Sequence, residues 1–317
     1  MKPGYVLPLR WDHDDGLAEL TDYLDRLSTV ADVVVVDGSP PELFARHALR
    51  WAGRVRHVAV DPDLRFRNGK VNGVLTGVRL LRTPYIVIAD DDVRYDAAGL
   101  AAVVALLGGA DLVLPQNFFA PLPWHARWDT GRMLLNRALG HDFPGTLAIR
   151  RETLARCGGY HGDVLFENLE LIRTVRAHGG TVRTADHVPV RRLPPSAGRF
   201  WSQRIRQAYD SLAQPVRLLV ELAVLPMCVV GILRNPRSLV TGVALVVALA
   251  EFGRRRAGGG TVFPADAALW APAWLVERGV CSWLAVLLRV RHGGVRYAGH
   301  RIRVAAHSTT WLRGHLG

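Results

Sequence analysis

The sequence has few cysteines, three in 317 residues. Cys157, Cys228 and Cys281 stand far apart, and they form neither a Cys-x-x-Cys pair nor a cluster with histidines. This spacing argues against a structural zinc site and favours a protein of a reducing compartment.

Two other features are missing from the sequence. The first ten residues, "MKPGYVLPLR", lack the long apolar core of a signal peptide, so we expect this part of the chain to stay in the cytosol. There is no internal repeat and no low-complexity tract. Because 49% of the residues are hydrophobic, the chain is too apolar for disorder and long enough for one large domain with an appendage.

The formal net charge of +12 favours contact with polyanions, which include nucleic acid, an anionic membrane surface and phosphorylated ligands. The arginines concentrate around the apolar segments of the C-terminal part. We therefore expect a membrane partner and no nucleic acid.

Short apolar runs alternate with helical patterns in the first two hundred residues. This alternation predicts an α/β fold built from parallel βαβ units, with strands buried on both faces. Ligands of such sheets bind at the carboxyl ends of the strands. The predicted strands are 5–9, 31–37, 55–60, 84–89 and 111–116, and the predicted helices are 17–27, 70–82 and 97–108.

The pattern changes after about residue 198. The stretch "SAGRFWSQRIRQAYDSL" predicts one amphipathic helix, and two apolar segments, 217–233 and 238–253, then flank the turn "RNPR". Each is slightly short for a full span of about 20 residues. We expect a membrane hairpin, followed by an interfacial or buried helix at 267–290. A soluble helical subdomain is the alternative.

These patterns predict three regions. Residues 1–198 form a catalytic domain, residues 199–214 an amphipathic interfacial helix, and residues 215–317 a membrane-associated helical region. The last region ends in a basic, glycine-punctuated tail, which is expected beside anionic lipid.

Three consecutive aspartates, Asp90, Asp91 and Asp92, end the predicted strand at 84–89. Two carboxylates one residue apart in a turning segment converge, and such a pair binds Mg²⁺ or Mn²⁺ while leaving positions for phosphate oxygens. We therefore predict a divalent metal at Asp90 and Asp92. The alternative is a turn or a helix N-cap, but one aspartate would be enough for either.

The order of motifs around these aspartates resembles that of the family 2 glycosyltransferases. Asp37 ends the stretch "VVVVDGSP", "NGKVNGVLTGVRL" follows at 68–80, and the Asp-x-Asp comes next. The resemblance covers roughly residues 4–210, and it implies the GT-A fold, a nucleotide-sugar donor and a metal-bound diphosphate. It also implies a set of donor contacts, namely Pro8, Asp37, Lys70, Asp90, Asp91 and Gly145.

The stretch "FENLELIRTVRAHGG" at 166–180 is similar to the acidic helix start that carries the general base of inverting family members. Asn168 stands where the family has that aspartate, and an amide does not accept a proton usefully at neutral pH. We expect the neighbouring Glu167 to act as the base, with Glu170 on the same helical face. The alternative is that both glutamates only complement the positive end of the helix.

The stretch "QRIRQ" at 203–207 resembles the Gln/Arg-x-x-Arg-Trp motif of processive and lipid-directed members. Gln203 and Arg206 match this motif, whereas Gln207 replaces its tryptophan. A guanidinium near the diphosphate would stabilise the charge of the leaving group. The alternative is a basic amphipathic helix lying on lipid.

Together the motifs predict a membrane-bound glycosyltransferase that works with inversion at the cytosolic face of the cell membrane. It would transfer a sugar from a nucleotide-sugar to a hydroxyl of a lipid-linked or amphipathic acceptor. Two alternatives from other classes stay open. One is a non-catalytic membrane protein that keeps the GT-A fold, for which Asn168 is the best evidence. The other is a nucleotidyltransferase, which also joins a Rossmann-like sheet to acidic metal ligands.

Overall fold

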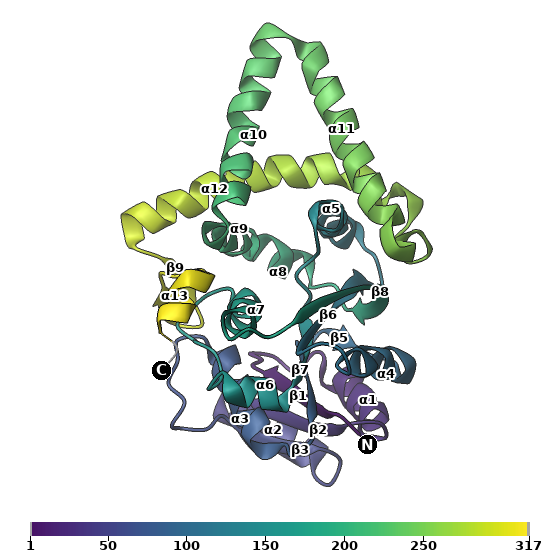
Figure 1. Ribbon diagram of the computed structural model, residues 1–317, viewed down its shortest axis with the longest axis vertical. Coiled ribbons are helices and arrows are strands. Elements are labelled where there is room, and N and C mark those ends of the chain that lie inside the picture. Colours follow the sequence, from purple (N-terminus) through teal and green to yellow (C-terminus); the bar gives the residue numbers. More distant parts are fainter. Residues whose placement is uncertain (1, 316–317) are drawn as a thin grey trace. The chain divides into compact units, whose positions relative to one another are not determined.

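The computed structural model describes residues 2–315, which fall into two compact units (Figure 1). Unit 1 comprises the chain up to residue 115, residues 143–190, and the chain from residue 307 onward. Unit 2 comprises residues 116–142 and 191–306. The chain therefore leaves the first unit twice and returns to it twice.

The sheet has the strand order β3-β2-β1-β4-β7-β6-β8-β5. Neighbouring strands from β3 to β4 run parallel, as the sequence predicts, and β7 is antiparallel to both β4 and β6. The antiparallel β7 lies in a stretch for which the sequence predicted no strand. The strands are β1 (Gly4–Leu9), β2 (Asp32–Asp37), β3 (Arg56–Ala59), β4 (Tyr85–Ala89), β5 (Val93–Arg94), β6 (Leu112–Phe119), β7 (Thr146–Arg150) and β8 (Val182–Arg192).

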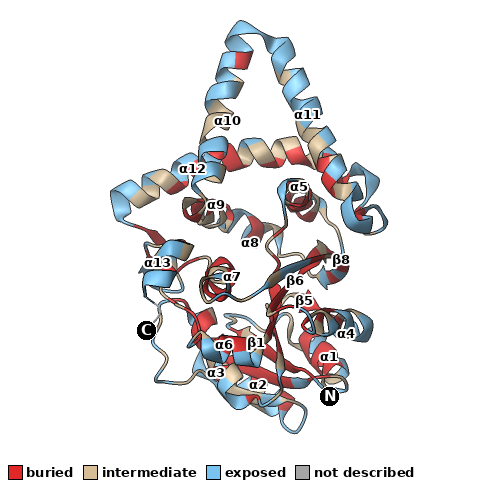
Figure 2. Cartoon of the chain, in the orientation of Figure 1, coloured by how far each residue is buried: buried red, intermediate tan, exposed pale blue. Residues whose placement is uncertain are grey.

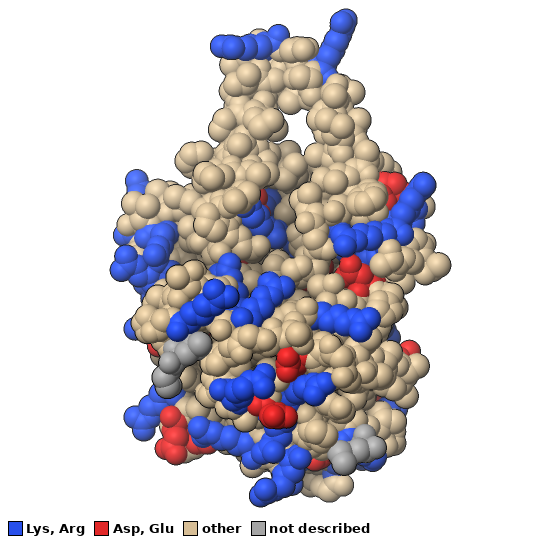
Figure 3. Space-filling model, in the orientation of Figure 1, with Lys and Arg blue, Asp and Glu red and all other residues tan. Residues whose placement is uncertain are grey.

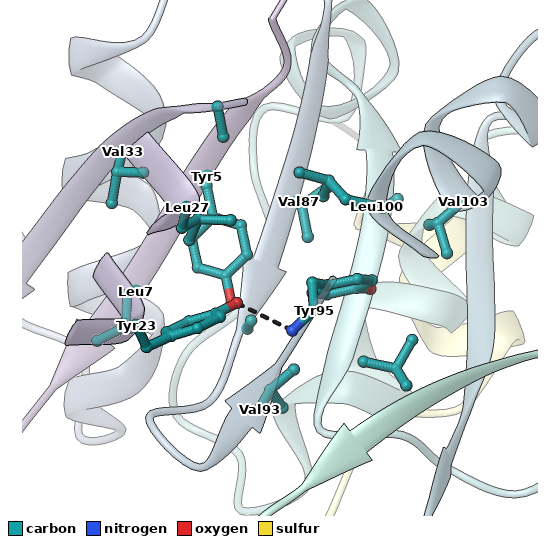
Figure 4. Packing of buried hydrophobic residues seen from close by; sticks show 14 of the residues in the cluster. Tyr5, Leu7, Tyr23, Leu27, Val33, Val87, Val93, Tyr95, Leu100 and Val103 are labelled. Atoms are coloured by element: carbon teal, nitrogen blue, oxygen red, sulfur yellow. Dashed lines mark hydrogen bonds between the residues drawn. The ribbon is translucent and has the colours of Figure 1, made fainter. Parts of the chain in front are cut away.

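Helices cover both faces of this sheet in unit 1, because successive side chains of a strand point to opposite faces. On β1, Tyr5 and Leu7 join one buried apolar cluster, and Val6 joins the other. Figure 4 shows the first cluster, in which the Tyr95 N–H donates to the Tyr23 hydroxyl at 3.1 Å. The helices are α1 (Leu17–Ser28), α2 (Pro41–Trp51), α3 (Gly69–Leu80), α4 (Ala97–Leu106), α6 (Arg151–Arg156), α7 (Glu167–Ala177) and α13 (Thr309–Gly314).

Helix α3 lies unusually close to β1, and its glycines permit this approach. A Cβ added at Gly73 would lie 2.9 Å from the Pro8 side chain, and one at Gly77 would lie 2.5 Å from Val6. The small residues of "GKVNGVLTG" are therefore a packing requirement, and they bring the start of α3 to the carboxyl end of β1.

Unit 2 is helical, with a core in which α5 packs against α11 and the segment before α12. Its elements are α5 (Trp124–Leu139), α8 (Ala197–Ser202), α9 (Arg204–Tyr209), α10 (Pro215–Arg234), α11 (Pro236–Arg255), α12 (Ala271–His292), β9 (Val295–Tyr297) and β10 (His300–Ile302).

The single amphipathic helix predicted for 196–212 is wrong. The segment is divided at Gln203 into α8 and α9, and a 3-10 turn at Asp210–Ala213 follows. The division coincides with Arg204, whose side chain is only 2% exposed and bonds to Asp129 and Glu277. The apolar stripe does not reveal this buried guanidinium, which lies next to the interruption at Gln203.

Three helices among the described residues are long and apolar enough to cross a membrane: Pro215–Arg234, Pro236–Thr261 and Ala265–His292. The first two form a hairpin whose residues are mostly exposed (Figure 2), and Figure 3 shows basic side chains at its tip. Glu221, which interrupts the first apolar stretch, is buried, accepts from the Ser282 hydroxyl at 2.7 Å and pairs with Arg217 at 2.9 Å. The charge that breaks the apolar pattern is thus neutralised within unit 2.

Candidate active site

The three aspartates follow β4 in a tight turn at the carboxyl end of the sheet, and each is partly exposed. The Asp90 N–H donates to the Gly145 carbonyl at 2.8 Å, so the turn is fastened to the residue just before β7. The Asp91 carboxylate accepts from the Trp11 indole N–H, which comes from the segment that follows β1. The turn is therefore held by backbone and side-chain bonds on two sides.

Lys70 brings the aspartate turn and the acidic helix together. Its Nζ lies 2.5 Å from Asp90 Oδ1 and 2.6 Å from Glu167 Oε1. Burial alone would lower the pKa of Lys70, but the charges of Asp90 and Glu167 raise it well above its usual value, so the side chain is an ammonium. Lys70, Asp90 and Glu167, which come from three separate sequence motifs, are therefore in direct contact.

The buried Asn68 positions both sides of this contact. Its Oδ1 accepts from the Lys70 backbone N–H at 3.1 Å, and so caps the start of α3. Its Nδ2 donates to the Val164 carbonyl at 3.0 Å, just ahead of α7. One amide side chain thereby fixes the helix that carries Lys70 relative to the segment that leads to Glu167.

Asn168, which follows Glu167 at the start of α7, has a structural partner. Its Nδ2 donates to the Pro144 carbonyl at 3.0 Å. A carboxylate at this position would have no proton to donate. The amide that departs from the family pattern is therefore accounted for by a bond to the loop that contains Gly145.

Asp37 ends β2 at the same edge of the sheet, but its carboxylate is fully buried and already bonded. Its Oδ2 lies 2.6 Å from His47 Nδ1 and 3.0 Å from His57 Nε2, and its Oδ1 accepts from the Ser39 N–H at 2.8 Å. Burial acts to raise the pKa of Asp37, but hydrogen bonds from His57, Ser39 and His47 lower it to about 2. The role of Asp37 in binding the donor stays a prediction, as do those of Pro8, Asp91 and Gly145.

His47 also reaches a second carboxylate, since its Nε2 lies 2.9 Å from Asp14 Oδ1. The His47 ring therefore lies between the carboxylates of Asp37 and Asp14. The sequence analysis missed these histidines and Asp14. The only signal was the position of His57 in the predicted strand 55–60, because nothing in the spacing of the histidines points to Asp37.

A further cluster in unit 1 joins α7 to the C-terminal segment. The fully buried Glu170 accepts from the His307 backbone N–H and faces its Nδ1, both at 2.7 Å, and His161 lies beside them. This group and the Asp37 group each bring three ligand atoms within 4.8 Å. In both, however, the carboxylate already binds histidine and backbone donors, so we interpret them as hydrogen-bonded clusters.

Gln203 and Arg206 belong to unit 2. Gln203 stands between α8 and α9, and the Arg206 guanidinium lies 5.3 Å from the centre of the Tyr297 ring. The buried cation of this segment is Arg204, which the sequence analysis did not single out. Gln207, the residue in place of the motif's tryptophan, accepts from Arg204 at 2.9 Å.

Comparison with known proteins supports the fold. No family model matches the sequence, and no curated protein matches it. The structure is similar to the mannosyltransferase PcManGT from Pyrobaculum calidifontis in complex with GDP-Man and Mn²⁺, with 21% identity and a TM-score of 0.57 over 92% of this chain and 88% of that one. Glucosyl-3-phosphoglycerate synthase from Mycobacterium tuberculosis with Mn²⁺ and UDP-Glc gives 18% identity and a TM-score of 0.45 over 65% of this chain and 77% of that one.

The similarity to the mannosyltransferase extends over nearly the whole of both chains, and its TM-score is the higher of the two. It shows that this chain has the GT-A fold. The fold class predicted from the alternation of strands and helices, and from the resemblance around Asp90, is therefore confirmed.

Proposed function

We propose that this chain is a family 2 glycosyltransferase, which transfers a sugar from a nucleotide-sugar to a hydroxyl of a lipid-linked or amphipathic acceptor. We further propose that the reaction inverts the anomeric centre and takes place at the cytosolic face of the cell membrane. The observation that carries the proposal is the meeting of Asp90 and Glu167 at Lys70, at the carboxyl end of a GT-A sheet. The metal ligand and the base both act on one donor, and these two carboxylates lie at one place in the fold.

The residues around the aspartate turn fit a divalent cation. Carboxylate oxygens are the ligands that Mg²⁺ and Mn²⁺ prefer. Asp90 already binds one positively charged group, the Lys70 ammonium. The mannosyltransferase with the similar fold binds Mn²⁺ together with GDP-Man. In this chain Asp90 and Asp92 would hold the metal. When bound, the metal would supply positive charge that neutralises the diphosphate of the donor.

The chain's own residues would then perform the transfer. The acceptor oxygen forms a bond to the anomeric carbon as the bond from that carbon to the diphosphate oxygen breaks. The hydroxyl proton passes to the Glu167 carboxylate, and the electron pair leaves with the nucleoside diphosphate. Arg206 would stabilise the charge on that leaving group, and Gln203 would bind beside it.

Asn168 does not weaken this assignment. Its bond to Pro144 gives the amide a structural reason, so the absence of the family's aspartate is not in itself a sign of lost activity. Pro8, Asp37, Lys70, Asp91 and Gly145 are the proposed donor contacts.

The apolar helices of unit 2 support the membrane part of the proposal. Exposed apolar side chains of the hairpin include Leu219, Met227, Leu233, Val240 and Leu245. A lipid-linked or amphipathic acceptor would reach a catalytic domain that is held at such a surface. The net charge of +12 suits an anionic cytosolic leaflet.

A thermal-shift panel of sugar nucleotides, with and without Mn²⁺, tests the proposal. A ligand that binds only the folded state raises its melting temperature by mass action, so at least one sugar nucleotide should stabilise the protein only when Mn²⁺ is present. Asp92→Asn should abolish this Mn²⁺-dependent shift while leaving the unliganded melting temperature nearly unchanged. An unchanged shift in a folded Asp92→Asn protein would exclude the metal role.

A further inference from the structure

Lysine is rare in this chain. Of the 40 Lys and Arg residues, two are lysines, Lys2 and Lys70. Lys2 is exposed and donates to the Ser28 carbonyl at 3.0 Å, far along the chain from the acidic residues of the site. The other lysine bridges Asp90 and Glu167, the two carboxylates on which the proposed reaction depends.

The difference between lysine and arginine matters at this position. An ammonium is a compact point charge with three rotatable donors, whereas a guanidinium is a planar fork. Lys70 places its charge at 2.5 and 2.6 Å from oxygens of two different carboxylates, a geometry that a small cation also adopts. The three side chains are between 14% and 20% exposed, so they lie in a partly dehydrated site where charge interactions are strong.

The same contact limits both proposed functions of these carboxylates. An ammonium at Oδ1 of Asp90 competes with a divalent cation for this carboxylate, because the two positive charges would lie side by side. Likewise, the Lys70 ammonium occupies a lone pair of Glu167 Oε1, and its positive charge opposes the transfer of a proton to this carboxylate. A positive charge beside the aspartate turn also repels an incoming cation.

We propose that Lys70 is a placeholder for the divalent cation, a positioning residue that holds Asp90 and Glu167 together until the cation and the donor arrive. Asp90 would pair with the bound cation in place of the ammonium, Lys70 would bind the diphosphate of the donor, and Oε1 of Glu167 would become available as the proton acceptor. This inference rests on the proposed function. It adds an order of events, in which the base becomes competent only after the donor site is filled.

The test is a titration with Mn²⁺ alone, in the absence of any nucleotide, followed by the electron paramagnetic resonance signal of free Mn²⁺. Lys70→Met removes both the competitor and its charge, so the variant should bind Mn²⁺ at least about tenfold more tightly than the wild type. Lys70→Arg keeps the positive charge and should not show this gain. Lys2→Met removes the other lysine and serves as the matched control, with unchanged affinity.

A second readout does not depend on how well the variants fold. Selective labelling of the lysine side chains with ¹³C at Cε gives two signals in the wild-type protein, and the Lys70→Met spectrum, or failing that Lys2→Met, assigns them. Titration of the wild type with Mg²⁺ should shift the Lys70 signal and leave the Lys2 signal in place.

Unchanged or weaker Mn²⁺ affinity in folded Lys70→Met would overturn the inference, and so would a Lys70 signal that does not move with Mg²⁺. Failure of the inference is distinguishable from failure of the proposed function. If a sugar nucleotide with Mn²⁺ still stabilises the wild type while Lys70→Met gains no affinity for Mn²⁺, only the placeholder role is lost.

Discussion

Asn168 donates its side-chain amide to the carbonyl oxygen of Pro144, at 3.0 Å, and thereby ties the start of α7 to the loop before β7. Asn168→Asp should lower stability, because the carboxylate has no proton to donate and its charge faces a carbonyl oxygen. A lost bond of this kind costs about 1–3 kcal/mol. Urea unfolding of the variant would measure the loss.

Asn168→Ala is the matched control, because it loses the same bond without adding charge. It should be destabilised less than Asn168→Asp. We also expect Asn168→Asp not to restore turnover to a Glu167→Gln protein, since the new carboxylate would be displaced from the loop. Equal stability of Asn168→Asp and the wild type would contradict the structural role of the amide.

Glu170 fastens the C-terminal segment to α7, because it is the buried partner of both the backbone and the ring of His307. Glu170→Ala should release this segment and cost about 2 kcal/mol or more, the usual effect of losing hydrogen bonds to a charged group. Hydrogen exchange of residues 307–314 should rise, whereas α10 should exchange as in the wild type. Unchanged protection of 307–314 would show that other contacts hold the segment.

Asp37 should make the free energy of unfolding decrease at low pH. Its pKa is about 2 in the folded protein and about 3.8 when unfolded, so the folded state favours the charged carboxylate. The resulting contribution, about 2 kcal/mol, is present in full well above pH 3.8 and is lost as the pH falls through the folded pKa; about half should be gone by pH 3. Asp37→Asn removes it, so the stability difference from wild type should shrink on acidification.

Asp63→Asn provides the control for this measurement. Asp63 is exposed, and substitutions at such surface positions change stability little. The unfolding free energy of this variant should stay within about 0.5 kcal/mol of the wild type at each pH. A stability difference for Asp37→Asn that stays constant from pH 7 to pH 3 would contradict the assignment.

The hairpin of α10 and α11 should insert into the membrane. Its exposed apolar residues bury hydrocarbon surface in lipid, so the protein should stay with the membrane after carbonate extraction. A full crossing would place the turn residues Arg234 and Arg237 on the far side of the membrane, against the positive-inside rule. A shallow hairpin that re-emerges on the cytosolic side avoids this conflict. A cysteine introduced at Ser238 should therefore be labelled from the cytosolic side. Full release by carbonate would contradict membrane integration.

The sequence predicted the parts of this structure that depend on local pattern. Buried strands end at Asp37 and just before Asp90, as their apolar runs predict, and the small residues of α3 pack against β1. The apolar segments of unit 2 also appear as helices close to their expected bounds.

What the sequence did not predict depends on contacts between distant segments. The pairing of His47 with both Asp14 and Asp37, the return of His307 to Glu170 and the burial of Arg204 all join residues that are far apart in the chain or follow no periodic pattern. Hydrophobic periodicity carries no information on such polar partners, and the single helix predicted across Gln203 is interrupted next to the buried Arg204.

The release of free nucleoside diphosphate tests the central claim most directly. The membrane-bound protein would be incubated with Mn²⁺, a lipid extract and the sugar nucleotide that stabilises it, and the products assayed for nucleoside diphosphate and pyrophosphate. We predict nucleoside diphosphate together with a labelled lipid, and a decrease of about 10²–10⁴-fold in Glu167→Gln with donor binding nearly unchanged. Release of pyrophosphate, or donor binding without transfer to any lipid extract, would contradict the assignment as a glycosyltransferase.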